Sequence, residues 1–315
     1  MCFPVARFSL AGRIQSGNFA PFLRHPDMNP HRITLVLSLG LAALAAAQST
    51  ISATARHAHA ANAGWIDFRT SAADGVVVAE NCLSGKAYAA NFGWIDLGDG
   101  TPANGYSYSN TTAGDFGVNL AATGALSGYA YAANVGWIAF EQAQGQPRLE
   151  FATGGFSGYA YSANLGWIAL GTSSATLVAA SMVAPDADGD GLADAYEMFY
   201  CGSLSVMNAT SNLDRDAASD LQEYAANTNP TDPASCLRIT QQAYNSAHDQ
   251  VTLTFTTAAN RLYSIEQATA LAGAWTDSGL SRFAPDAGAT SARTINFAAG
   301  TRRFFRAVAH RPLQP

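Results

Sequence analysis

Two twelve-residue stretches in the middle of the chain carry acidic side chains at the spacing of a calcium-binding loop. The first, residues 186–197, reads DADGDGLADAYE and fills every specified position of the pattern D-x-D-x-D-G-x5-E. Calcium takes about six to eight oxygen ligands, which such a loop supplies from alternate positions and from its last residue. Gly191 at the sixth position permits the sharp turn. The predicted ligands are Asp186, Asp188, Asp190, the backbone carbonyl of Leu192, Asp194 and Glu197.

A second loop, residues 212–223, repeats this spacing with two departures. Asn212 replaces Asp at the first position, and Ala217 replaces Gly at the sixth. Asn keeps an oxygen but loses a charge, and an alanine in a left-handed conformation costs on the order of 1 kcal/mol. We therefore expect this loop to bind more weakly than the first, with an empty or purely structural loop as the alternative. Its predicted ligands are Asn212, Asp214, Asp216, Asp220 and Glu223.

Each loop runs into a short predicted helix, Ala193–Tyr200 after the first and Ser219–Ala226 after the second. Gly202 and Asn227 follow as stop signals. Pro185 directly before the first loop argues against a helix entering it. The pattern therefore predicts a loop followed by a helix, used twice.

Residues 184–234 resemble the thrombospondin type 3-like and the dockerin-like, EF-hand-related calcium segments of bacterial extracellular proteins. The loop spacing does not decide between the two families, although Glu197 and Glu223 stand where dockerins usually carry Asp. The resemblance implies calcium as the cofactor and an extracellular setting. We assign residues 186–234 as a paired calcium-binding segment.

Residues 1–47 are predicted to be a signal peptide. The apolar run Leu35–Ala47 is too short for a membrane span, follows Arg32, and ends in small residues typical of a cleavage site. Met28 is an alternative start of translation, and cleavage after Ala60 is an alternative to cleavage after Ala47. A cytosolic helix is the alternative to a signal peptide. No second apolar run of spanning length follows. The protein is therefore expected to be secreted or held at a bacterial cell surface, without a membrane span after cleavage.

The charge of the chain narrows the choice of partners. Cleavage after Ala47 would change the formal net charge from −6 to −9, because four arginines and one aspartate would leave, and Lys86 is the only lysine. An acidic surface that is poor in lysine disfavours nucleic acid and anionic membranes as partners. It suits calcium ions, together with a surface protein or a polysaccharide as a binding partner.

Three cysteines would remain in the processed chain. Cys201 and Cys236 flank the second loop, and an oxidising compartment would permit a disulfide between them, with two free thiols as the alternative. Cys82 is then expected to be a free or buried thiol. Their spacings match no zinc-binding pattern.

Residues 61–171 repeat one short unit. Complete copies span Leu83–Leu97, Leu126–Phe140 and Phe156–Leu170, and a truncated copy spans Asn62–Phe68. Side chains alternate with a period of two on both sides of an Asn-x-Gly turn, which predicts a strand, a turn and a strand. Such a unit cannot bury one face alone, so we expect a stacked β array, either a solenoid or a propeller-like arrangement.

The tryptophan of each unit allows two interpretations. It could belong to a buried aromatic ladder, or it could present a flat face to sugar rings. We expect the ladder, because aromatics in stacked units usually pack on one another. The unit resembles the Gly-Tyr-Ala-Trp/Tyr-x-x-Asn-x-Gly-Trp-Ile repeats of predicted secreted proteins from environmental bacteria, a resemblance that implies no activity.

The remainder of the chain is predicted to be β structure. Residues 172–185 are expected to form a linker of small residues. Residues 237–311 are predicted to form a β-sandwich module, with strands near 251–255, 263–266, 293–297 and 304–308. Residues 261–266 and 271–275 resemble a C-terminal module that follows calcium segments in secreted proteins of planctomycete and verrucomicrobial type. That resemblance implies an accessory role.

Signatures of catalysis are missing from the sequence. It contains no G-x-S-x-G, H-E-x-x-H or phosphate-cradling G-x-x-x-x-G-K pattern, and no acid spacing that identifies a glycosidase. His57 and His59 are expected in an unstructured leader, with a metal contact as the alternative. We predict a mostly β, secreted, non-enzymatic protein with a structural, adhesive or binding role, in which calcium rigidifies the joint between two β domains. The alternative is a secreted polysaccharide-binding accessory protein or a hydrolase.

Overall fold

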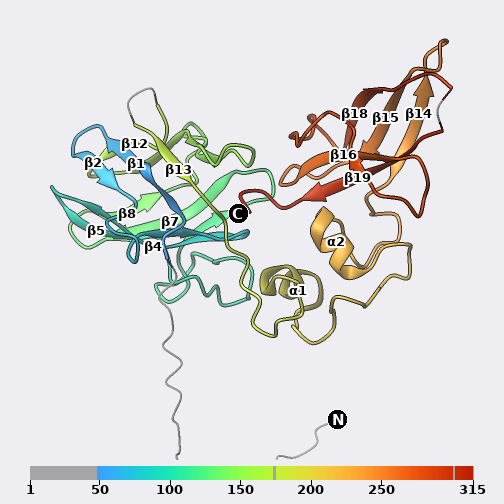
Figure 1. Ribbon diagram of the computed structural model, residues 1–315. Coiled ribbons are helices and arrows are strands. Elements are labelled where there is room, and N and C mark those ends of the chain that lie inside the picture. Colours follow the sequence, from blue (N-terminus) through green and yellow to red (C-terminus); the bar gives the residue numbers. More distant parts are fainter. Residues whose placement is uncertain (1–47, 173–174, 301, 315) are drawn as a thin grey trace, which may run out of the picture. The chain divides into compact units, whose positions relative to one another are not determined.

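The chain folds mainly into β structure. The computed structural model describes residues 48–172, 175–300 and 302–314, and over these residues it contains nineteen strands and two helices (Figure 1). The helices are α1 (Asp194–Cys201) and α2 (Asp220–Ala226). The mostly β prediction is therefore confirmed. The predicted signal peptide, residues 1–47, lies outside the described residues.

Eight strands of the repeat region close into a barrel (Figure 1). In order of pairing they are β1 (Ile51–Ala60), β2 (Gly64–Asp67), β4 (Cys82–Ala89), β5 (Gly93–Asp96), β7 (Leu126–Ala132), β8 (Gly136–Ala139), β11 (Tyr159–Ser162) and β12 (Gly166–Ala169). Neighbouring strands are antiparallel, and β12 returns to pair with β1 through Ala169 opposite His59. The strand pairing therefore shows a closed barrel in place of the predicted solenoid or propeller-like array.

Each copy of the repeat is one hairpin of the barrel, and the first copy is complete. Its opening strand is β1, in which His57 and His59 occupy the positions of Tyr129 and Tyr131 in β7. The prediction of an unstructured leader at these histidines is wrong, because β1 pairs with both β2 and β12. A cut after Ala60 would remove a strand from the closed barrel.

Small and medium side chains fill the barrel interior. The inward positions, each 4 % exposed or less, are Ala58, Ala60, Ala87, Ala89, Ala130, Ala132, Ala160 and Ser162 on the first strands of the hairpins, and Ile66, Ile95, Ile138 and Ile168 on the second strands. An eight-stranded barrel is just wide enough for side chains to fill it. Alanine side chains opposite isoleucine side chains are small enough for this interior, whereas indole rings at the inward positions would be too large for it.

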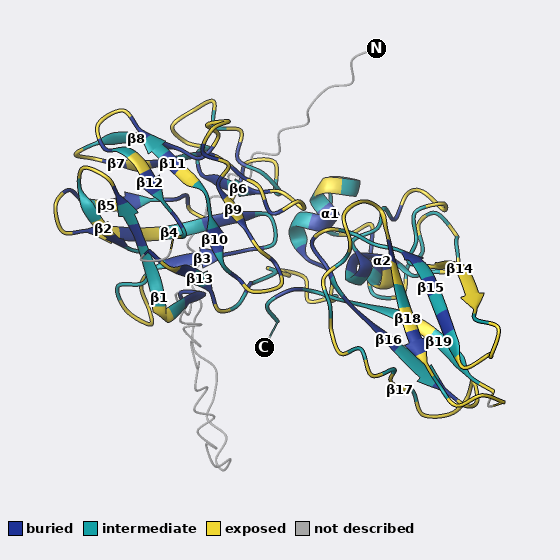
Figure 2. Ribbon diagram, turned by 90° about the horizontal axis from the view of Figure 1, so that it is seen from above, coloured by how far each residue is buried: buried dark blue, intermediate teal, exposed yellow. Residues whose placement is uncertain are grey.

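The tryptophans consequently face outward. Trp65, Trp94, Trp137 and Trp167 are 38–51 % exposed, and the alternation of buried and exposed residues is visible along the barrel strands (Figure 2). The prediction of a buried aromatic ladder is therefore wrong, although the predicted alternation of the two faces is confirmed. Each tryptophan instead contacts its cross-strand neighbour edge to face, as in the pair Tyr131–Trp137 at 4.9 Å.

The asparagine of each turn joins one hairpin to the next. Its side-chain amide donates to a backbone carbonyl in the neighbouring turn: Asn91 to Ala63 (2.8 Å), Asn134 to Phe92 (3.0 Å), Asn164 to Val135 (2.9 Å) and Asn62 to Leu165 (3.2 Å). These four bonds form a ring at one end of the barrel. In each turn the positive φ belongs to the glycine, as at Gly136 (79°), and not to the asparagine.

Short strands extend the barrel at its other end. They are β3 (Val76–Val78), β6 (Val118–Leu120), β9 (Arg148–Leu149), β10 (Phe156–Ser157) and β13 (Leu177–Ala179). β3 pairs with β4, β6 pairs with β4 and β7, β9 pairs with β10, and β13 pairs with β1. Because β13 lies within residues 172–185, that stretch is partly barrel rather than the predicted linker.

A pair of glycines in one hairpin gives a test of this close backbone packing. Gly128 and Gly136 have φ values of 86° and 79°, so alanine strains either position by about 1–2 kcal/mol. An added Cβ at Gly128 would lie 2.4 Å from the carbonyl oxygen of Gly117, whereas one at Gly136 meets no atom within 4 Å. Urea unfolding should show Gly128→Ala losing about 1–3 kcal/mol more than Gly136→Ala. Equal losses would contradict the register of β6 against β7.

Two three-stranded antiparallel sheets follow the helices. One has the order β14 (Ile239–Tyr244), β15 (Gln250–Thr256) and β18 (Thr290–Asn296), and the other has the order β17 (Thr276–Asp277), β16 (Leu262–Ala268) and β19 (Phe304–His310). Both sheets contribute to one buried cluster, with Val251, Leu253, Phe255 and Ile295 from the first and Tyr263 and Ile265 from the second. The four predicted strands are confirmed.

Candidate metal sites

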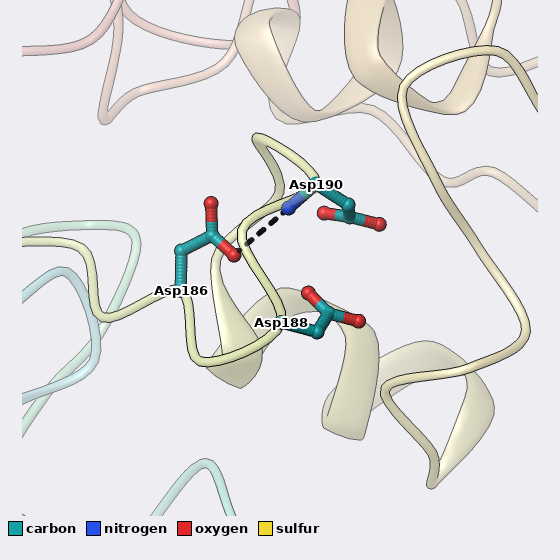
Figure 3. Close-up of side chains that lie close together, drawn as sticks. All are labelled: Asp186, Asp188 and Asp190. Carbon is teal, nitrogen blue, oxygen red and sulfur yellow. Dashed lines mark hydrogen bonds between the residues drawn. The ribbon is translucent and has the colours of Figure 1, made fainter. Parts of the chain in front are cut away.

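The first acidic loop gathers its early aspartates around one small volume. Oxygens of Asp186, Asp188 and Asp190 all lie within 4.8 Å of one another (Figure 3). Asp186 also holds the loop in shape, because its carboxylate accepts hydrogen bonds from the amides of Gly189 (2.7 Å), Asp190 (3.2 Å) and Gly191 (2.9 Å). The loop is thus wound so that three carboxylates converge, as the sequence predicted.

Glu197, at the end of this loop, is buried without a partner. It lies in the first turn of α1, is 0 % exposed, and has no hydrogen bond to either carboxylate oxygen in the described part of the chain. Burial, and then the charges of the loop aspartates, raise the pKa of Glu197 to about 7. A carboxylate in such surroundings is costly unless a cation or a donor compensates it.

The second acidic loop forms a similar cluster. Oxygens of Asp214, Asp216 and Glu223 lie within 4.8 Å of one another. Glu223 is 1 % exposed; it accepts a hydrogen bond from the Thr228 hydroxyl (3.2 Å), while its other oxygen has no partner in the described chain. Burial and the neighbouring aspartates raise the pKa of Glu223 to about 7. Asn212 contributes a buried side-chain oxygen that also lacks a partner there.

The backbone strain expected in the second loop falls on a different residue. Ala217 does not adopt a positive φ; Arg215, two residues earlier, does, at 64°. It corresponds to Gly189 of the first loop, which has a φ of 76°. The predicted cost of a left-handed Ala217 is therefore wrong, and a cost of similar size belongs to Arg215. The other reason given for weaker binding, the loss of one charge at Asn212, is unaffected.

The ninth residue of each loop braces the loop from the start of its helix. Asp194 accepts a hydrogen bond from the amide of Ala187 (2.8 Å), and Asp220 accepts one from the amide of Leu213 (3.0 Å). Neither aspartate belongs to the clustered sets of three oxygens. Of the predicted ligands, the structure thus brings Asp186, Asp188 and Asp190 together, and likewise Asp214, Asp216 and Glu223.

The two loop–helix units pack on each other. Their shared cluster contains Leu192, Ala193, Tyr196, Met207 and Tyr224. The rings of Tyr196 and Tyr224 lie 5.1 Å apart, and the Tyr196 hydroxyl donates to the carbonyl of Thr228 (2.9 Å). The two loop–helix units therefore share one apolar core.

The ends of both helices agree with the sequence signals. Ser219 caps α2 in a reciprocal capping box with Gln222, and Gly202 and Asn227 end α1 and α2 in left-handed conformations.

Cys82, Cys201 and Cys236 are free thiols, so the structure does not contain the disulfide considered for the second loop.

A buried arginine joins the second loop unit to both neighbouring β regions, and sequence reasoning missed it. Arg261, 1 % exposed, donates to the carbonyls of Tyr224 (2.8 Å) and Ala225 (2.9 Å) at the end of α2. Its guanidinium lies 3.7 Å from Glu80, a residue between β3 and β4, and Arg311 lies 3.7 Å from the same carboxylate. A single arginine before a strand carries no sequence signal for such a contact.

No protein-family model, curated protein or solved structure matches this chain. Among the residues that the structure describes, no helix is long and apolar enough to cross a membrane. Among the described residues, the two acidic clusters are the groups whose side chains could hold a metal ion.

Proposed function

We propose that this chain is a secreted or cell-surface calcium-binding protein of a bacterium, with a structural, adhesive or binding role. Calcium in the two acidic loops would hold residues 186–234 as a rigid joint between the barrel and the C-terminal sheets, which we take to form a β-sandwich module. The observation that carries the proposal is Glu197, a fully buried carboxylate with two unpartnered oxygens. It lies outside the set of three converging aspartates, but their charges act on it.

The donor chemistry favours calcium over other metals. Every clustered group is a carboxylate oxygen, with no imidazole or thiolate among them. Oxygen donors suit hard cations, whereas zinc and copper prefer nitrogen and sulfur. A set of carboxylates from one flexible loop suits the larger and more variable shell of calcium better than the strict octahedron of magnesium.

The packing explains how bound calcium would stiffen the joint. Without a cation the carboxylates of each loop repel one another, and the loops share one small apolar cluster. The end of α2, which follows the second loop, is held by Arg261 from the C-terminal region. A ligand that binds only the folded state stabilises it by about 2.7 kcal/mol at a hundredfold excess over its Kd.

Calcium titration by calorimetry tests the proposal. Loops of this extracellular type bind calcium with Kd values of roughly 10⁻⁴ to 10⁻³ M, so uptake should be measurable at millimolar calcium.

We expect EDTA to make residues 184–234 sensitive to protease while the barrel and the C-terminal sheets survive. Glu197→Gln should reproduce that loss more fully than Glu223→Gln, because Asn212 already lowers the charge of the second loop.

Two results would contradict this proposal. One is the absence of calcium uptake at millimolar concentration by the correctly folded chain. The other is unchanged protease resistance in both glutamine variants. Glu266→Gln is a suitable control, because Glu266 lies on β16, outside both acidic clusters, and is paired with the exposed side chain of Arg306.

A further inference from the structure

We infer that Trp137, together with the loop that precedes β6, forms a binding site for the neutral sugar rings of an oligosaccharide. The inference rests on the barrel alone and is independent of calcium binding. It follows from the outward orientation of the tryptophans, which removes the packing role that the sequence suggested for them.

A pocket of about 420 Å³ opens beside Trp137 on the outer face of the barrel. It is lined by Asn110, Thr111, Thr112, Ala113, Phe116, Tyr129 and Trp137. Trp137 and Tyr129 come from the hairpin β7–β8, and the other residues come from the long connection between β5 and β6. The connection thus builds a wall next to an aromatic floor.

The aromatic floor is held in place before any ligand arrives. The ring of Phe116 lies 5.2 Å from that of Trp137 at an interplanar angle of 81°, and the ring of Tyr129 lies 6.1 Å away at 76°. Tyr131 contacts the same indole at 4.9 Å. Three neighbouring rings therefore restrict the indole while 46 % of Trp137 stays exposed. Such preorganisation lowers the ordering cost of binding.

The wall is also anchored by hydrogen bonds. Asp115 accepts from the amides of Ala103 (3.1 Å) and Ser109 (3.0 Å), and the side chain of Asn110 accepts from the amide of Gly117 (3.0 Å). These contacts fix both ends of the segment that carries Thr111, Thr112 and Ala113. The pocket is therefore a built feature of the connection.

The lining selects for a neutral ligand with both apolar and hydroxyl faces. It presents aromatic rings together with threonine hydroxyls and an amide, and none of the lysine and arginine side chains that the structure describes lines it. The Tyr129 hydroxyl donates to the carboxylate of Glu141, which places negative charge at this face. An anionic ligand is thereby disfavoured. A pyranose ring offers C–H bonds to stack on an indole and hydroxyls to bond the polar rim, which matches this mixture.

Two of the three equivalent tryptophans in the other hairpins provide an internal comparison. Trp94 is 51 % exposed and contacts Tyr88 at 5.0 Å, but Lys86 stands at the position of Tyr129. Trp65 contacts the imidazole of His59. Neither tryptophan lines the pocket described for Trp137. Trp94→Ala is therefore a matched control for Trp137→Ala.

The test uses the full chain after removal of any leader, first on an array of neutral oligosaccharides and then in calorimetric titrations with the retained glycan. Array spots should include cellotetraose, maltotetraose and chitotriose, with acidic oligosaccharides as comparison. We expect at least one neutral oligosaccharide to bind. Trp137→Ala should weaken that binding by about tenfold or more, as for a central aromatic contact, and Trp94→Ala should change it less than about twofold.

A second variant separates binding from folding. Ala113→Trp places a bulky ring at an exposed position of the wall and leaves the aromatic floor intact, so it should block binding while the melting temperature stays unchanged. Three outcomes would overturn the inference: no neutral oligosaccharide is retained, only acidic glycans are retained, or Trp94→Ala loses as much affinity as Trp137→Ala.

Discussion

Arg261→Met should lower the free energy of unfolding by about 3–5 kcal/mol, the usual cost of removing one partner from a buried charged network. Methionine fills much of the volume but donates no hydrogen bond. The carbonyl of Ala225 would lose its guanidinium donor, and that of Tyr224 would keep the amide of Asn227 (3.1 Å). The carboxylate of Glu80 would lose one of its two arginines. Urea unfolding and limited proteolysis at the end of α2 both measure the effect.

Arg306→Met is the control for this prediction. Arg306 lies 2.6 Å from Glu266, closer than Arg261 lies to Glu80, but its side chain is 51 % exposed. Exposed ion pairs contribute roughly 0.2–1 kcal/mol, because water already solvates both charges. If the two variants lose the same stability, Arg261 is not the buried link between α2 and Glu80 that the structure describes.

Ile138→Ala should lower the free energy of unfolding by about 2–5 kcal/mol, because it leaves a cavity in a close-packed interior. Ile138 is buried among the alanines of the barrel, whereas the adjacent Trp137 faces outward. Thermal and urea unfolding of the variant measure the loss.

Iodide should quench the tryptophan fluorescence of the unmodified protein, as expected for half-exposed indoles.

Tyr131→His is the matched outward substitution. The first hairpin already carries histidine at this position, where His59 contacts Trp65 at 4.9 Å, the same distance as between Tyr131 and Trp137. Surface changes of this kind usually stay within about 0.5 kcal/mol. A loss at Tyr131→His as large as that at Ile138→Ala would reverse the assignment of the inner and outer faces.

The sequence predicted local elements of the candidate metal sites. Loop spacing identified Asp186, Asp188 and Asp190, whose oxygens the structure brings together, and the stop signals Gly202 and Asn227 ended both helices where the structure ends them. These features depend on contacts within a few residues. The position of the strain in the second loop was predicted wrongly, because the pattern does not show that the turn bends at Arg215.

The barrel could not be predicted in the same way. Alternation of Trp137 and Ile138 shows two faces but not which face is buried, since both residues are apolar. The deciding quantity is the width of the ring, which depends on β12 pairing with β1 across more than a hundred residues. His59 further concealed the first strand, because it replaces the tyrosine that the three other copies share.

Closure of the ring has a consequence for how such a repeat can evolve. A solenoid can grow by duplication, because each new unit packs on an open end. Here the asparagine of the first hairpin bonds to the turn of the fourth, and β12 already occupies the free side of β1. A fifth hairpin could enter only by opening the ring, and the wider barrel would leave space that alanine and isoleucine do not fill. Four copies therefore match this interior, so variation should accumulate in the connections between hairpins.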